Sequence, residues 1–150
     1  MAVATAKKAA PKATKVFTSD ERDAMEERAK EMKRGKAPRA DGEADVLAKI
    51  AEMVDTDRVM AERIHAVVKA AAPELAAKTW YGMPAYAKND KIVCFFQPAA
   101  RFKTRYATFG FSDAAKLDDG NVWANAFAVM KLTPADERRI AALVKQAVGG

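Results

Sequence analysis

Basic residues alternate with aromatic residues in one short stretch of the chain, which makes it the first candidate for binding chemistry. Arg101, Lys103 and Arg105 are interleaved with Phe102 and Tyr106. In a β-strand, the basic side chains would share one face and the aromatic side chains the other. Basic groups beside aromatic rings bind anionic ligands, phosphate or single-stranded nucleic acid. A solvated strand end explains the pattern about equally well, so both interpretations stay open.

A second group lies in residues 79–86, which read Thr-Trp-Tyr-Gly-Met-Pro-Ala-Tyr. Gly82 lets the backbone turn, and Pro84 is accepted at the start of a strand. Tryptophan and tyrosine combine a large apolar surface with one polar group, which suits a pocket wall. They also suit a hydrophobic plug between a helix and the sheet, and the residues alone favour the plug. The candidate ligand-binding residues of the two groups are Trp80, Tyr81, Met83, Tyr86, Arg101, Lys103 and Arg105.

Carboxylates spaced four residues apart form the candidate metal site. Asp23, Glu27 and Glu31 would share one face of a helix and offer hard oxygen ligands. Basic residues are interleaved with them, and acidic residues early with basic residues late also suit the helix dipole. A solvated, self-neutralised face is therefore the favoured interpretation.

Catalytic motifs are scarce. Nucleophilic catalysis needs a base within hydrogen-bond reach, and the chain has one histidine, His65, and one cysteine, Cys94. His65 falls beside the apolar stripe of a predicted helix and Cys94 lies within an apolar run, so we interpret both as structural. A single cysteine also excludes an internal disulfide. The sequence predicts that the protein is not an enzyme.

The first 17 residues form a predicted disordered tail, because Ala, Lys, Thr and Pro bury too little surface to order a chain. The tail resembles the Lys-Ala-Pro tails of linker histones, which implies weak, salt-dependent DNA association. A solubilising leader is the favoured interpretation. The tail has no apolar secretory core, and no stretch of the chain is long enough for a membrane span, so we expect a cytoplasmic protein. Four of the net +6 charges come from its lysines, Lys7, Lys8, Lys12 and Lys15.

Four helices are expected. A capping box at Thr18–Glu21 predicts an additional N-terminal helix to about Arg34, within residues 18–40. Asp41 is the predicted cap of the second helix, and the third begins near Asp55 and stops before Pro73. Thr133-Pro134 opens the last helix. The second helix should bury one face made of Val46, Leu47, Ile50, Met53 and Val54.

Strands are expected between the third and the last helix, where aromatic and β-branched residues gather between turn residues. The predicted strands are 84–88, 92–96, 104–111 and 126–131, with 92–96 central and a tight turn at 88–91. The length of 150 residues suits one domain, which we place at 41–150. The predicted class is α+β, with N-terminal helices, a four- to five-stranded antiparallel sheet and a C-terminal helix.

One sequence pattern resembles the signature of the YdhG-like domain family. It consists of Trp80, Gly82-Met83-Pro84 and Tyr86, and a short turn and the apolar strand 91–96 follow it. The resemblance covers residues 43–148. It implies a frataxin-like sandwich of helices and sheet and, as for some members, an intracellular iron chaperone. Frataxins hold iron mainly on an acidic ridge of the first helix, whereas here the most acidic helix, 18–34, is mixed with basic residues.

From the residues and the resemblance together we expect a small non-enzymatic binding protein that handles iron or a small ligand. One alternative is a DNA-associated accessory protein that uses the Lys-Ala-Pro tail and the basic strand. Another alternative is a partner-binding adaptor that docks through the first helix.

Overall fold

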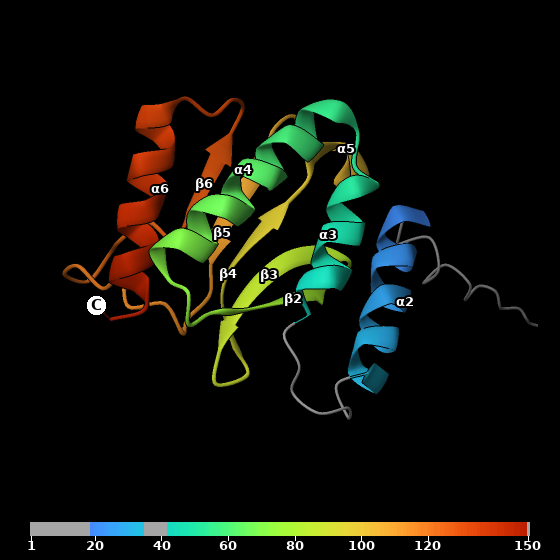
Figure 1. The fold of residues 1–150 in the computed structure, drawn as a ribbon, viewed down its shortest axis with the longest axis horizontal. Helices are drawn as coiled ribbons and strands as arrows, with labels where there is room; N and C mark the ends of the chain where they lie inside the picture. The colour runs from blue at the N-terminus through green and yellow to red at the C-terminus, as the bar shows by residue number, and fades with distance from the viewer. Residues whose placement is uncertain (1–18, 35–41, 150) are drawn as a thin grey trace, which may run out of the picture.

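The computed structural model describes residues 19–34 and 42–149 (Figure 1). The predicted tail 1–17 and the predicted caps Thr18 and Asp41 lie outside these residues. The helices are α2 (Ser19–Arg34), α3 (Glu43–Ala51), α4 (Asp55–Ala71), α5 (Ala99–Phe102) and α6 (Pro134–Ala147). The strands are β2 (Ala76–Trp80), β3 (Met83–Lys88), β4 (Lys91–Gln97), β5 (Ala107–Phe111) and β6 (Ala126–Val129).

The five strands form one antiparallel sheet in the order β2-β3-β4-β5-β6. Helices α3, α4 and α6 cover one face, which we call the inner face, and α2 lies beside α3 at the β2 end (Figure 1). This arrangement confirms the α+β class and the central position of β4. None of the helices within the described ranges is long and apolar enough to span a membrane.

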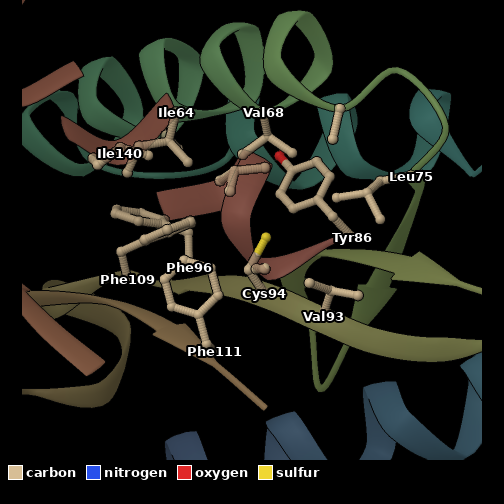
Figure 2. Packing of buried hydrophobic residues seen from close by; sticks show 14 of the residues in the cluster. Ile64, Val68, Leu75, Tyr86, Val93, Cys94, Phe96, Phe109, Phe111 and Ile140 are labelled. Carbon is tan, nitrogen blue, oxygen red and sulfur yellow. The ribbon is translucent and has the colours of Figure 1, made fainter. Parts of the chain in front are cut away.

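The core lies between the inner face and the helices. Cys94 and Phe96 of β4 pair with Phe111 and Phe109 of β5 and point toward the helices (Figure 2). Ile64 of α4 is among the helix residues that meet them, and all of these side chains are buried. This burial explains why aromatic residues dominate the strands, since large rings fill the space between a sheet and its helices.

Two hairpins use two-residue turns in which both residues have positive φ. Asn89 and Asp90 join β3 to β4 with φ of 52° and 66°, which confirms the predicted turn. Tyr81 and Gly82 join β2 to β3 with φ of 54° and 77°. Turns with this sign of φ match the right-handed twist of paired strands and keep hairpins tight.

The predicted strand 104–111 is wrong at its start. Ala99–Phe102 forms the helical turn α5, Lys103 follows with a φ of 55°, and β5 begins only at Ala107. The basic residues of this stretch therefore do not share a strand face. The cause is tertiary: Asp57 of α4 accepts a hydrogen bond from the backbone N–H of Ala100 and so stabilises the helical turn.

Two further differences concern the β2 end of the sheet. Strand β2 was not predicted, because its Ala-Ala-Lys-Thr-Trp sequence has little β-branched character. The predicted face of the second helix is partly wrong, since Leu47 is 46% exposed and Val54 is 55% exposed. Helix α3 ends at Ala51, so Val54 lies beyond it and serves as the N-cap residue of α4.

The outer face of the sheet carries a close contact between Phe95 and Gly110. These residues are directly paired, and a Cβ atom added at Gly110 would lie 2.5 Å from Cζ of Phe95. The Phe95 ring therefore lies across the backbone of β5, in space that only a glycine leaves free.

Gly110→Ala is expected to lower the free energy of unfolding by about 1–3 kcal/mol, because the added methyl group overpacks the Phe95 ring. Urea unfolding followed by circular dichroism measures this loss. In a Phe95→Leu background the same substitution should cost less, since the aromatic ring is gone. Equal costs in both backgrounds would contradict the contact.

Candidate functional site

The candidate site lies at the end of the sheet where the β2–β3 turn meets α2, α5 and the start of α4. Tyr81, the first residue of this turn, has a left-handed backbone conformation, which is uncommon for a bulky residue. Backbone strain of this kind is kept only where surrounding contacts over-determine it, and it is frequent at binding sites. The turn is therefore the starting point for building the site.

Contacts from two sides support the turn. The Arg28 guanidinium of α2 lies 5.7 Å from the centre of the Tyr81 ring. The Trp80 ring meets Tyr81 and Phe95 edge to face, each with centroids 5.3 Å apart. Aromatic pairs in this geometry add attraction beyond the burial of their area. The strained residue is thus held by a helix on one side and by the sheet on the other.

Gly82, the second residue of the turn, is in direct contact with Arg101 of α5. The guanidinium occupies the space where a Cβ atom at Gly82 would lie. Arg101 itself is half-buried and lies 5.4 Å over the ring of Phe102. Asp57, which is buried, fixes α5 through the Ala100 hydrogen bond of 2.9 Å. The position of Arg101 thus depends on α4 and on the absence of a side chain at Gly82.

A cavity of ≈ 470 Å³ opens beside this turn, and we call it the α2 cavity. Its walls come from α2, α3, the α3–α4 connection, the start of α4, the β2–β3 turn, and α5 with its N-cap residue. Arg101 and Lys49 contribute positive charge, while carboxylates come from α2, from the C-cap residue of α3, Glu52, and from Asp57 of α4. The lining residues are Asp23, Glu26, Glu27, Lys49, Glu52, Met53, Val54, Asp57, Gly82, Pro98, Ala100 and Arg101.

Ion pairs attach α2 to the rest of the domain. Glu27 pairs with Lys49 of α3 at 3.0 Å, and Asp20 pairs with Lys103 at 3.0 Å. Ala24 is buried between these two positions. Exposed pairs contribute little individually, so α2 is held by several weak contacts together.

The structure brings together three of the seven predicted ligand-binding residues. Trp80, Tyr81 and Arg101 meet around Gly82, whereas Met83 is buried below them. Lys103 pairs with Asp20, and Arg105 extends over the ring of Tyr106 at 5.0 Å. These basic residues therefore diverge because α5 replaces the expected strand.

The structure describes the side chains of two of the three predicted metal-binding residues. Asp23 and Glu27 line the α2 cavity, while the side chain of Glu31 lies outside the description. Among the side chains that the structure describes, no group of three or more His, Cys, Asp or Glu residues is arranged to hold a metal ion.

Tyr86, the seventh predicted residue, belongs to a buried polar network on the inner face. Its hydroxyl lies 2.8 Å from Nδ1 of His65, and Nε2 of His65 lies 2.7 Å from a carboxylate oxygen of Glu43. Because a carboxylate only accepts, Nε2 of His65 donates to Glu43, which leaves Nδ1 to form the hydrogen bond with the Tyr86 hydroxyl. The network joins α3, α4 and β3, and no spacing in the sequence pointed to it.

Burial also changes the acidity of two groups in this region. It raises the pKa of the Tyr86 hydroxyl, with smaller contributions from Cys94 and Glu43. Burial alone raises the pKa of the Cys94 thiol. A thiol kept in its protonated form is a poor nucleophile, which agrees with a structural role for Cys94.

Comparison with models of known families, with curated proteins and with solved structures gives no match to this chain. The resemblance to the YdhG-like domain family therefore stays a prediction from the residues quoted above.

Tyr86→Phe is expected to destabilise the protein by about 1–3 kcal/mol, because His65 Nδ1 loses its hydrogen-bond partner in a buried position. Chemical unfolding measures the loss. Tyr106→Phe, at a half-buried ring on the surface, is the matched control and should stay within about 0.5 kcal/mol of the wild type. Equal effects of the two substitutions would contradict the network.

Stability is expected to fall as the pH rises above the ordinary thiol pKa of 9.0. There the unfolded chain releases the Cys94 proton while the folded chain keeps it, which favours unfolding by up to about 1.4 kcal/mol per pH unit. Below that pH both states are protonated and the contribution is constant. Unfolding of the wild type and of Cys94→Ala between pH 7 and 10 tests this, since the variant should show a shallower decline. Identical slopes would contradict it.

Proposed function

We propose that the protein is a non-enzymatic binding protein whose ligand occupies the α2 cavity. The observation that carries the proposal is the meeting of Arg101 with the carboxylates of α2 around one cavity beside a strained turn. Small-ligand sites have volumes of roughly 300–1,000 Å³ and combine apolar walls with a few polar groups. The α2 cavity has this size and this mixture.

The lining groups favour a small zwitterion as the ligand. The planar guanidinium of Arg101 suits a carboxylate, because its donors match two oxygen atoms at once. Glu26 and Glu52 suit an ammonium group. Glu52 lies 3.7 Å from Lys49, and Glu26 has no ion pair among the side chains that the structure describes. Met53, Val54 and Pro98 supply apolar wall for the carbon chain between the two charges.

Iron handling, which the family resemblance implies, is the second candidate. Asp23 and Glu27 line the same cavity and offer hard oxygen ligands, although Glu27 is already paired with Lys49. A cytoplasmic location is part of the proposal. It agrees with a fold whose single cysteine, Cys94, is buried, so that no disulfide and no oxidising compartment is needed.

The proposal is tested by titrating the ¹⁵N-labelled full chain with γ-aminobutyrate, butyrate and butylammonium. The zwitterion should shift the amide signals of Gly82, Met53 and Ala100 at lower concentration than either singly charged probe. Arg101→Gln should weaken this binding at least about tenfold, because a charge-assisted pair is lost. Arg105→Gln, which removes an exposed arginine outside the cavity, should leave it unchanged.

Anaerobic titration with ferrous iron separates the second candidate. If the site holds iron, Asp23→Asn should weaken iron binding and Arg101→Gln should not. If none of the three organic probes shifts the cavity amides, or if Arg101→Gln and Arg105→Gln act alike, the zwitterion proposal is wrong.

A further inference from the structure

The chain segment that contains strands β2 to β5 has a charge bias that the α2 cavity explains only in part. Strands β2 to β6 contain no Asp or Glu. Between residues 76 and 112 the only acidic residue is Asp90, in the β3–β4 turn. The same segment contains six basic residues, which are Lys78, Lys88, Lys91, Arg101, Lys103 and Arg105.

Two aromatic rings lie on this outer face. The strand register places Lys78, Ala85, Phe95 and Gly110 in one row across the sheet, and Trp80 stands next to that row. The rings of Trp80 and Phe95 are in contact, and both are half-buried. We call these two rings the stacking platform. Its neighbours in the row, Ala85 and Gly110, are too small to screen it.

The platform lies on the side of the sheet away from the main helices (Figure 1), and both of its rings keep part of their surface exposed. Helices α3, α4 and α6 pack on the inner face, and the blue ribbon of α2 passes the outer side at the β2 end (Figures 1 and 2). The Arg28–Tyr81 contact fixes α2 at the β2–β3 turn. Polar residues that are also half-buried, Gln97 and Thr108, lie on the side of Phe95 toward α5.

Basic residues lie near the platform in the fold and along the chain. Lys78 stands in the same row as Phe95. Exposed Arg105 comes two residues before β5, near the end of the sheet where Gln97 pairs with Thr108. Arg105 is in contact with the Tyr106 ring, so its guanidinium is held close to the domain surface. Aromatic rings flanked by cations suit a ligand that has both flat rings and regularly spaced negative charge.

We propose that the outer face binds single-stranded nucleic acid. Unpaired bases stack on Trp80 and Phe95, and the phosphates on either side contact Lys78 and Arg105. Stacking of bases on aromatic side chains tolerates every base, so the binding has little sequence preference. A duplex does not fit this mode because its bases are already stacked internally. This site is separate from the α2 cavity and does not depend on the function proposed for that cavity.

The test uses the full chain with Trp123→Phe, which leaves Trp80 as the only indole. Titration with a 15-mer of deoxythymidylate should quench the Trp80 emission in a saturable way. The double substitution Lys78→Glu and Arg105→Glu, made in the Trp123→Phe chain, should weaken binding of the oligonucleotide at least tenfold. The slope of log affinity against log salt should become shallower by about 1.4, since each phosphate contact contributes about 0.7 on a single strand.

The matched control is Arg138→Glu with Lys145→Glu, which makes the same change of charge at exposed positions of α6. It should retain the quenching and weaken binding less than threefold. Phe95→Leu should weaken binding about fivefold or more with the salt slope unchanged, because it removes stacking and leaves the charges. Circular dichroism verifies that each variant is folded.

Several results would overturn the proposal. Binding through the N-terminal lysines alone would raise the anisotropy of a labelled oligonucleotide without quenching Trp80. Equal quenching by heparin, which has negative charge and no bases, would show that stacking is not involved. Equal loss of affinity in the platform and α6 double variants would show that only net charge matters, and absence of binding to the 15-mer would end the proposal.

Discussion

Position 82 has no room for a side chain, and much of the candidate site depends on this constraint. The Arg101 guanidinium fills the space beside Gly82, and the positive φ of Gly82 closes the two-residue turn. The turn holds Trp80 and Tyr81 at the end of the sheet, while Arg101 reaches the α2 cavity. One backbone position therefore links the hairpin, the short helix α5 and the cavity.

The two faces of the sheet have different physical roles. The inner face buries aromatic rings against three helices and includes one polar network, Glu43–His65–Tyr86, whose hydrogen bonds satisfy its buried groups. Such networks specify how elements align because unsatisfied polar groups are costly. The outer face keeps Trp80 and Phe95 half-buried among small and basic residues. Packing thus dominates the inner face, whereas the two aromatic rings of the outer face stay partly exposed.

Local sequence signals predicted the elements whose causes are local. Thr133 caps α6 through a capping box with Asp136, and Asn89-Asp90 forms the expected turn. Periodicity likewise located α4, and a continuous apolar run located the central strand β4. These features depend on residues within a few positions of one another, which is the range over which caps, turns and amphipathic patterns act.

Features set by distant residues could not be predicted. Helix α5 depends on a hydrogen bond from Ala100 to Asp57, which is 43 residues away in the sequence. Because this helix replaces the expected strand, Arg101 and Arg105 do not share one strand face. The partners of His65 come from α3 and β3, so a lone histidine in the sequence gave no sign of them. The α2 cavity requires a helix outside the predicted core domain. The aromatic run around Gly82 was recognised, but only the structure separates its inner and outer faces.

The most direct measurement of the central claim is the effect of Gly82→Ala on the NMR signal of the Arg101 side-chain Nε–Hε group. The added methyl group requires the guanidinium to move, so this signal should shift while the ring signals of His65 and Tyr86 stay at their wild-type positions. An Arg101 signal unchanged in a folded Gly82→Ala variant would contradict the account, because the glycine would then not be what positions the arginine.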